Sequence, residues 1–477
     1  MTRRAVTALV VAAGVVAAAA IVVVSRGDAA SAAAPSYTRT VAPLIAEKCA
    51  GCHRVGGIAP FRLDTPAAAH KYAGPIEAAV RSRAMPPWPP GPSSPPYVGQ
   101  SGRVLSPAQR TTLLGWAHAG GPTDGPATPA PPATTPAARA GETTLDLPLP
   151  QPYTPQATGG ATDDYRCFLL DPGLAQNAFV TSARIVPGAA RVVHHVILFR
   201  VEPAEVAQAQ RLDQAAGGQG WPCFGGTGIA VTGADGLGDA PWVSAWAPGW
   251  GGGRLPEGTG VPLKAGSRIV MQIHYNLLNG RTRDRSRAVL TVASAGTALR
   301  PLQTILLPAP VELACSKGET GRLCNRDAAI RDLARKYGQA AGYTPLWLLV
   351  LCRGDAVHVR PSAISTCDRR LDRQRHRSSS AGHMHLLGAS IKVELNPGTP
   401  RRRVLLDIPR WDFHWQNAYQ LVQPVSAGPG DVLRVTCRHD VTRRHHTEGV
   451  PHTPHYILWG EGTTDEMCLG IVQVTRG

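Results

Sequence analysis

Aromatic residues are scarce in this chain, at 5% of its 477 residues, whereas glycine and proline are abundant, at 51 and 43. Glycine and proline interrupt helices, so this composition disfavours long helices and favours many short strands joined by turns. The length is enough for about three domains of ~150 residues each, and each can bury a sizeable core.

A recognisable nucleic-acid-binding module is also missing. The net charge is +16, and the clearest basic clusters are Arg369–Arg377 and Arg401–Arg403. Neither cluster forms a stripe on a known binding fold, so we expect no nucleic-acid partner. We expect the charge to lie on the solvated surface of an exported protein.

An apolar segment, Ala5–Val24, follows two arginines at the start of the chain. Twenty apolar residues are long for a signal-peptide core and just enough to cross a bilayer, whereas the small residues that follow are typical of a cleavage site. Residues 1–35 are therefore predicted to be a signal peptide or a membrane anchor, and the sequence leaves both open. In both cases the body of the protein lies outside the cytoplasm, in the periplasm, at the cell surface or secreted.

Cys49, Cys52 and His53 form a C-x-x-C-H motif. Two such thiols can form thioethers with haem vinyl groups, and the histidine then reaches the iron. A zinc site would need a second pair of ligands nearby, but the next cysteine is Cys167. A thioredoxin-like motif would need a βαβ context, which is absent. The motif therefore predicts one covalent haem c.

Met85, in a proline-rich loop, is the predicted sixth ligand of the haem iron. The prolines would hold a rigid loop that presses the thioether onto the iron. His/Met ligation raises the potential relative to bis-histidine ligation, which suits a mild electron donor. His70 and His118 are the alternatives, but each lies in a predicted helix and is expected at the surface.

The stretch 36–121 resembles a small cytochrome c. Its matching residues are the motif above, Ala59-Pro60-Phe61 and Met85-Pro86-Pro87-Trp88. The resemblance implies a small all-α haem domain. The Pro/Ala-rich residues 122–141 have no apolar period and are predicted to be an extended linker that tethers this domain to the rest of the chain.

Two adjacent histidines, His194 and His195, lie in an apolar run that indicates a buried strand. Buried imidazoles need partners, because a buried polar group without one costs a few kcal/mol. Adjacent strand residues point to opposite faces, so both can bind one ion only if the strand bulges or ends there. His274 lies on another alternating strand, where it points away from the most apolar face.

His383 and His385 are separated by one residue, so on a strand both side chains leave the same face and can bind one ion. Met467 adds a thioether at the end of another strand-like run. Together with the earlier histidines, this set predicts a copper protein, because imidazole and thioether ligands suit copper. A further histidine-rich stretch is polar and is predicted not to be a metal site; it contains His439, His445, His446, His452 and His455.

Five motifs of the chain occur in the order found in one enzyme family. They are Asp164-Tyr165-Arg166-Cys167, His194-His195, Met271-Gln272-Ile273-His274-Tyr275, His383-Met384-His385-Leu386-Leu387-Gly388 and Asp465-Glu466-Met467-Cys468. Together they resemble the copper type II, ascorbate-dependent monooxygenases, the family of peptidylglycine α-hydroxylating monooxygenase and dopamine β-monooxygenase. The resemblance covers nearly all of the chain after the linker.

This resemblance implies two antiparallel, jelly-roll-like β-sandwich domains, 142–305 and 306–477, which face each other across a solvent-filled cleft. It also implies two copper sites: an electron-transfer copper at His194, His195 and His274, and a catalytic copper at His383, His385 and Met467. Two imidazoles plus a soft thioether favour Cu(I), the state that binds dioxygen. Gln272 matches a family glutamine beside the first copper. The chain departs from the animal enzymes by its haem segment and by an inserted, cysteine-containing stretch, 306–366.

Eight cysteines remain after the two of the C-x-x-C-H motif are set aside from the ten. An exported chain would pair them, but eight cysteines allow many connectivities. The family resemblance implies Cys167–Cys223 and Cys437–Cys468. In the inserted stretch, the low cost of closing short loops favours Cys315–Cys324 and Cys352–Cys367, and the connectivity there stays open.

Two functions are compatible with these ligands. The first is a copper monooxygenase that hydroxylates an aliphatic C–H bond of a small substrate with O₂. Its electrons come through the fused c-type haem from an external donor, either an ascorbate-like reductant or a redox protein. The second is an extracytoplasmic copper and haem protein for electron transfer or copper handling, without hydroxylase activity. The thioether ligand favours the enzyme, because a relay would not need an O₂-binding copper.

Four aromatic residues in the predicted C-terminal domain have two possible structural roles. They are Trp411, Phe413, Trp415 and Tyr419. They line the cleft or belong to the core, and the sequence leaves both open, because aromatic side chains serve both roles.

Overall fold

The structure is a computed structural model. It describes residues 34–55, 59–126, 138–157, 162–229, 239–247, 252–278, 280–447 and 452–476. The apolar segment predicted to be a signal peptide or anchor lies outside these residues, as does the middle of the predicted linker. No described helix is long and apolar enough to cross a membrane.

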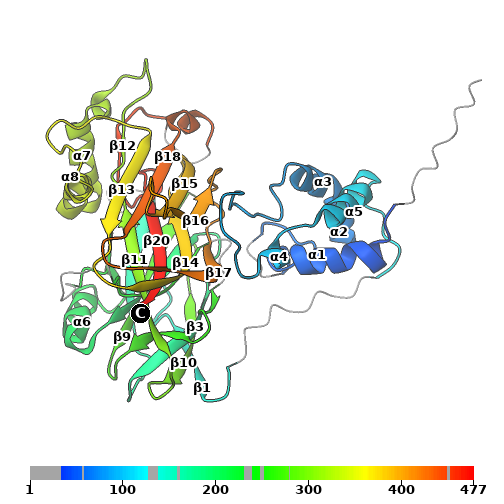
Figure 1. Ribbon diagram of the computed structural model, residues 1–477, viewed down its shortest axis with the longest axis horizontal. Helices are drawn as coiled ribbons and strands as arrows, with labels where there is room; N and C mark the ends of the chain where they lie inside the picture. Colours follow the sequence, from blue (N-terminus) through cyan, green and yellow to red (C-terminus); the bar gives the residue numbers. More distant parts are fainter. Residues whose placement is uncertain are drawn as a thin grey trace, which may run out of the picture.

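The first described part of the chain is helical (Figure 1). It contains a π-helix, Tyr37–Val41, and the helices α1 (Ala42–Lys48), α2 (Pro66–Lys71), α3 (Ala73–Arg81), α4 (Gln100–Arg103) and α5 (Pro107–His118). Proline stands in the first turn of α1, α2 and α5, where its fixed φ suits the helix start. Ser106 and Gln109 form a capping box at the start of α5. Trp116 and Leu113 of α5 pack with Tyr37 in the core of this part.

The rest of the chain is built from four β-sheets. A nine-stranded sheet has the order β1 (Glu142–Pro148), β10 (Arg287–Ser294), β3 (Ala178–Val186), β8 (Thr259–Leu263), β11 (Arg300–Pro308), β20 (Leu469–Arg476), β14 (Arg375–His383) and β17 (Ala418–Ala427), and β7 (Gly253–Arg254) pairs with β3. A five-stranded sheet has the order β5 (Trp221–Pro222), β2 (Asp163–Leu170), β9 (Arg268–Asn276), β4 (Val193–Val201) and β6 (Trp242–Trp246). A four-stranded sheet has the order β13 (Ile364–Arg370), β18 (Val432–His439), β15 (Gly388–Leu395) and β16 (Arg403–Ile408), and β12 (Glu312–Leu313) pairs with β19 (Ile457–Leu458).

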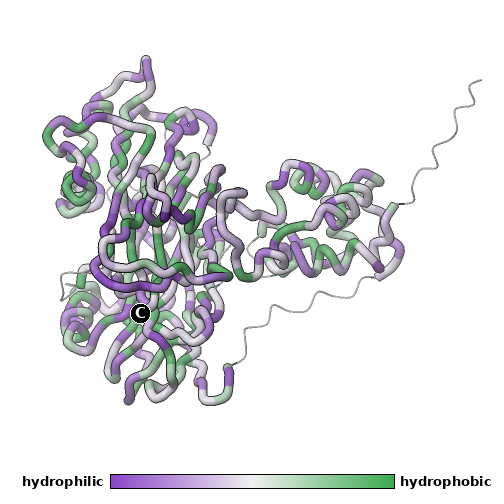
Figure 2. Tube along the Cα trace, viewed as in Figure 1, coloured by the Kyte–Doolittle hydropathy of each residue, from purple (hydrophilic) through white to green (hydrophobic). Residues whose placement is uncertain are grey.

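Three helices border these sheets. They are α6 (Val206–Ala215), α7 (Arg326–Tyr337) and α8 (Gln339–Leu351), and α7 and α8 belong to the inserted stretch. The two large apolar cores lie between sheets: one uses side chains of β3, β4, β9 and β10, and the other uses side chains of β11, β15, β18 and β20. In Figure 2, hydrophobic residues, drawn in green, alternate with more polar ones through the region of these strands and also occur along the helices. The central strands of the five-stranded sheet therefore have fixed positions, and they carry the first three histidines.

The predicted fold class, a small all-α cytochrome c domain followed by two antiparallel β-sandwich domains, is wrong. The described chain is mostly β-sheet. Five α-helices precede the sheets, but the described α-helices span only 4 to 13 residues, and they do not form a clear N-terminal all-α cytochrome c domain. Nor does it form two separate sandwiches, because β8 and β11 pair in parallel and join the two halves into the nine-stranded sheet. Periodicity predicts individual strands, but it does not specify which distant strands pair.

The proline-rich loop after α3 packs against the sheets, so the helical part is not connected to them by the linker alone. The amide of Gly91 donates to the Asp407 carbonyl at 2.8 Å, and the amide of Val98 donates to the Gln420 carbonyl at 2.9 Å. Tyr97 is 3% exposed, and its hydroxyl donates to the Leu405 carbonyl at 2.9 Å. Figure 1 shows this loop reaching β16 and β17. A side chain at Gly91 would meet Pro409 at 2.8 Å, so glycine is needed for this approach.

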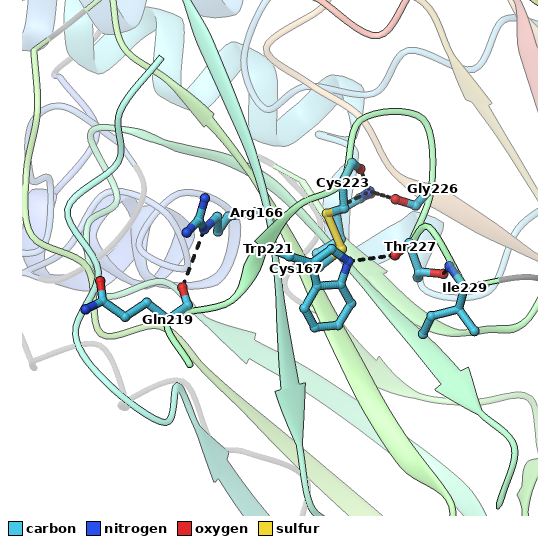
Figure 3. The surroundings of a disulfide bond; sticks show 9 residues. Arg166, Cys167, Gln219, Trp221, Cys223, Gly226, Thr227 and Ile229 are labelled. Atoms are coloured by element: carbon cyan, nitrogen blue, oxygen red, sulfur yellow. Dashed lines mark hydrogen bonds between the residues drawn. A yellow bond between two sulfur atoms is a disulfide. The ribbon is translucent and has the colours of Figure 1, made fainter. Parts of the chain in front are cut away.

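Four disulfides form, and they are the pairs named above: Cys167–Cys223, Cys315–Cys324, Cys352–Cys367 and Cys437–Cys468. Figure 3 shows the first of them, with the indole of Trp221 beside it donating to the Thr227 carbonyl at 2.8 Å. Disulfides persist in oxidising compartments, so the four bonds indicate an extracytoplasmic or secreted protein.

Removing Cys437–Cys468 by replacing both residues with alanine should lower the free energy of unfolding by about 2–5 kcal/mol, because the bond restricts the unfolded chain. The two cysteines are 31 residues apart, whereas Cys315 and Cys324 are 9 apart. The matched double replacement at the shorter loop should cost about 1 kcal/mol less. Urea unfolding of both variants measures the difference, and a larger cost for the shorter loop would contradict the loop-length argument.

Candidate metal sites

The first group of predicted ligands lies on two neighbouring strands, β4 and β9. His195 is the pairing partner of His274, and the register shifts between Val193 and His195, which marks a bulge. In a regular strand His194 and His195 would point to opposite faces, and the bulge lets both face His274. The sequence had required such a bulge if both histidines were to bind one ion.

The three imidazoles of this group converge on one point. The Nδ1 atom of His194 lies 3.2 Å from that of His195 and 3.3 Å from that of His274, and the Nδ1 atoms of His195 and His274 are 3.3 Å apart. Two nitrogens bound at about 2.0 Å to one ion with a tetrahedral angle lie roughly this far apart. Three neutral rings cannot satisfy one another by hydrogen bonds alone, so the arrangement fits a shared cation. Among the described residues, this is the one group of three His, Cys, Asp or Glu side chains with ligand atoms close enough for one ion.

Asp163 fixes the orientation of His274. Its carboxylate accepts a hydrogen bond from the Nε2–H of His274 at 2.7 Å and another from the Thr463 hydroxyl at 2.6 Å. Burial alone would raise the pKa of Asp163, but its hydrogen bonds with His274 and Thr463 lower it to about 2. With Nε2 carrying the proton, Nδ1 of His274 keeps its lone pair for a metal. The ring of Tyr165 stacks on His274 with 4.1 Å between centroids.

The second group forms where β14 and β20 pair. His383 ends β14 and is the pairing partner of Leu469, two residues after Met467. The Nδ1 of His383 lies 2.6 Å from Oε1 of Gln416, and the Nδ1 of His385 lies 3.2 Å from the Asp465 carbonyl. Both partners accept, so each Nδ1 donates and each Nε2 keeps its lone pair.

Met467 lines the same cavity as His383 and is 4% exposed. The ring centroids of His383 and His385 are 5.1 Å apart. These three residues lie near the end of one strand pair, and a donor set of two imidazoles and a thioether would fit Cu(I).

Burial keeps these imidazoles uncharged. It lowers the pKa of His194, His195 and His385 well below the ordinary histidine value, with the neighbouring histidines adding to the effect. Burial also lowers the pKa of His383 to about 4, although the Gln416 hydrogen bond acts in the opposite direction. Metal binding requires neutral imidazole, so all four rings are in the ligand form at neutral pH.

The two groups are neighbours. The ring centroids of His195 and His383 are 6.0 Å apart, in an edge-to-face arrangement. Phe413 stacks on His194 with centroids 4.6 Å apart and lies 6.1 Å from His385. The family resemblance implies a solvent-filled cleft between the sites, whereas in this structure the two groups contact each other directly.

The four aromatic residues that were expected either to line the cleft or to belong to the core lie mainly in the core. Trp411, Phe413 and Tyr419 are buried in the core of the second half, and Phe413 also contacts the histidines. Trp415 is partly buried. Gln272, expected beside the first copper, lines the cavity, and its amide donates to the Cys223 carbonyl at 2.8 Å.

The histidine-rich stretch has other partners. His439 is buried, and its Nε2 lies 3.0 Å from Glu466, behind Met467. His445 faces Glu319 at 3.3 Å, and the Nδ1 of His455 lies 2.9 Å from the Thr453 carbonyl. These contacts assign ion-pair and hydrogen-bonding roles to His439, His445 and His455.

The C-x-x-C-H motif lies just after α1. Cys49 and Cys52 are unpaired, in contrast to the eight other cysteines. The Nδ1 of His53 lies 3.1 Å from the Phe61 carbonyl, which leaves Nε2 without the proton. Met85 follows α3 and is 41% exposed.

The two alternative haem ligands already have partners. The Nδ1 of His70 lies 2.9 Å from the Gly121 carbonyl. His118 is largely exposed and lies 3.3 Å from Glu77.

Sequence reasoning missed two residues that shape the metal sites, Asp163 and Gln416, and it left the role of Phe413 open. The sequence contained a signal for Asp163, because this residue begins a buried strand and a buried carboxylate needs a partner. Phe413 and Gln416 lie in an irregular segment before β17, where periodicity gives no direction for a side chain.

Comparisons with known proteins bear on the second half of the chain. A search of curated proteins finds no match. Among solved structures, the major capsid protein P2 from bacteriophage PM2 aligns with 70% of this chain and 97% of its own, at 8% identity and a TM-score of 0.23. A xanthan lyase from Paenibacillus aligns with 74% of this chain and 28% of its own, at 11% identity and a TM-score of 0.16. Scores this low carry no argument about fold or function.

One family model does match, over residues 356–473, which contain His383, His385 and Met467. It describes the C-terminal domain of copper type II ascorbate-dependent monooxygenases. That family uses copper and O₂ together with a reductant, so the match supports an oxidoreductase. The C-terminal part of this chain is therefore similar to the C-terminal domain of a copper-dependent monooxygenase family.

Proposed function

We propose that this protein is a copper monooxygenase that hydroxylates an aliphatic C–H bond of a small substrate, using O₂ and electrons supplied through a c-type haem. The observation that carries the proposal is the pair of unlike side-chain groups beside one cavity: three imidazoles in one, and two imidazoles with a thioether in the other. An electron-transfer relay would not need a second, O₂-binding copper.

In the proposed reaction, one oxygen atom enters the C–H bond and the other leaves as water, which takes two electrons and two protons from the donor. Copper held by His383, His385 and Met467 would supply the activation of O₂, and copper held by the first three histidines would supply the further electron. The chain's own residues hold the ligands in place: Asp163 orients His274, and Gln416 orients His383. The 6.0 Å between His195 and His383 supports direct passage of an electron between the sites.

The residues of the C-x-x-C-H motif fit a covalently bound haem. Cys49 and Cys52 are free to form thioethers, and the Nε2 of His53 is free to bind iron. Burial and the neighbouring Cys52 raise the pKa of Cys49 to about 12, so it is a neutral thiol until it reacts. When bound, the haem would supply a one-electron carrier.

The loop that follows Met85 supports a route for these electrons. Trp88 lies edge-on to Tyr419, with centroids 5.5 Å apart, and packs against the core of the second half. Tyr419 comes three residues after Gln416, which bonds His383. The loop thus connects the haem motif to the proposed catalytic site without the long linker.

Replacing Met85 by alanine should lower the haem potential and open the iron to carbon monoxide. His/Met ligation raises the potential, and the methionine occupies the sixth coordination position. Redox titration and the carbon monoxide difference spectrum measure this, with His70→Ala as the matched control. An unchanged reduced spectrum in the Met85 variant would assign the sixth ligand elsewhere.

Oxygen uptake with ascorbate as donor tests the proposed function. We expect copper-dependent uptake that rises when a substrate is added, and ¹⁸O from labelled O₂ in the hydroxylated product. A protein that holds both coppers yet takes up no oxygen with any substrate tried would favour the electron-transfer or copper-handling function.

A further inference from the structure

The two metal sites share a cavity of about 580 Å³. This volume lies within the roughly 300–1,000 Å³ typical of pockets for small molecules. His195, His383 and Met467 line one side. The inserted helices also line the cavity, through Tyr337, Ala341, Thr344, Trp347 and Leu348. The inserted stretch therefore forms part of the wall of the proposed active site.

The cavity is mainly apolar. Its described lining includes Ile197, Phe224, Trp242, Trp246 and Leu306, and it contains no lysine or arginine. A carboxylate would therefore be buried without a cationic side chain to pair with, which is unfavourable.

Two of the three amide side chains in the described lining are already hydrogen-bonded. The Oε1 of Gln416 accepts from His383, and its Nε2 donates to the Phe413 carbonyl. The Nε2 of Gln272 is bonded to the Cys223 carbonyl. Glu461 is the acidic side chain of the described lining. Burial, with the neighbouring Asp465, raises its pKa to about 7, so it is a weak partner for an ammonium group.

We infer that the substrate is an uncharged, largely apolar molecule, held between α8 and strands β4 and β6 with a C–H bond facing His383 and Met467. This deepens the proposed function and rests on it. The surface next to the cavity is apolar as well, because Trp347 lines the cavity and is also 48% exposed. On the same face of α8 stand four more exposed apolar side chains, at helical spacing: Tyr343, Leu346, Val350 and Leu351.

Calorimetric titration of the full copper-loaded protein, kept reduced so that both coppers are Cu(I), tests the inference with three matched probes, because soft Cu(I) binds carboxylate oxygen weakly. The probes are octan-1-ol, octanoate and octylammonium, which share one chain and differ in charge. We expect octan-1-ol to bind at least about tenfold more tightly than either ion, because octanoate meets no lysine or arginine in the described lining and Glu461 is only a weak partner for octylammonium. Lengthening the alcohol by one methylene should tighten binding by up to about fourfold, until the cavity is filled.

Two variants locate the site. Thr344→Arg places a cation in the wall and should reverse the order of octan-1-ol and octanoate. Tyr343→Arg, next to it on the exposed face, should leave the order unchanged. Trp347→Ala removes an exposed part of the wall, and it should weaken octan-1-ol several-fold while both coppers stay bound.

Failure of the inference can be told apart from failure of the proposed function. Binding of octanoate or octylammonium as tight as that of octan-1-ol, or no binding of any probe, would overturn the inference even in a protein that holds two coppers. Tight octan-1-ol binding by a protein that holds no copper would overturn the proposed function and leave the apolar site in place.

Discussion

His383→Ala and Met467→Ile should each reduce the copper content from two ions per chain to one and abolish oxygen uptake. A change in a residue that only supports a metal ligand costs about 10–100-fold in metal affinity, so losing a direct ligand should cost at least as much. The remaining copper should stay at the first group, because those histidines lie on β4 and β9 while His383 and Met467 lie at β14 and β20. Copper analysis and the electron paramagnetic resonance spectrum of the oxidised protein measure the two sites separately.

His376→Ala is the matched control. His376 lies on the same strand as His383, but its Nδ1 bonds Ser426 at 2.7 Å in an exposed position. This variant should keep both coppers and full oxygen uptake. Loss of both coppers from His383→Ala would show that the two sites do not bind independently.

Electron transfer from the haem to copper should be intramolecular. When the haem is reduced anaerobically and the copper is kept oxidised, haem reoxidation should proceed at a rate that does not change over about a tenfold range of protein concentration. A tethered partner has an effective concentration near the millimolar range, and the packed loop adds fixed contacts to that tether. Stopped-flow absorbance at the haem band measures the rate.

Variants of the loop separate its role from that of the linker. Trp88→Ala and Gly91→Val should slow reoxidation at least several-fold, because the first removes the contact with Tyr419 and the second forces the loop away from Pro409. Gly102→Val is the control, since a side chain at that glycine meets no atom within 4 Å. A rate that rises with protein concentration, or that needs an added mediator, would contradict the intramolecular route.

The site could be predicted in part. Residue type, spacing and family resemblance named the six proposed copper ligands, and the structure brings His194, His195 and His274 together. Alternation on a strand had shown that His194 and His195 could face one ion only with a bulge, and a register shift lies between Val193 and His195. The parallel pairing of β8 and β11 joins strands that no short-range pattern relates, so the two-sandwich prediction failed there. Contacts between distant segments, such as those of Tyr97 with β16 and β17, were not predicted for the same reason.

The most direct test is a crystal structure of the copper-loaded protein with anomalous differences measured at the copper absorption edge. Two copper peaks should appear, one among the Nδ1 atoms of His194, His195 and His274, and one within reach of His383, His385 and the thioether of Met467. A single peak, or copper bound away from these six side chains, would contradict the proposal.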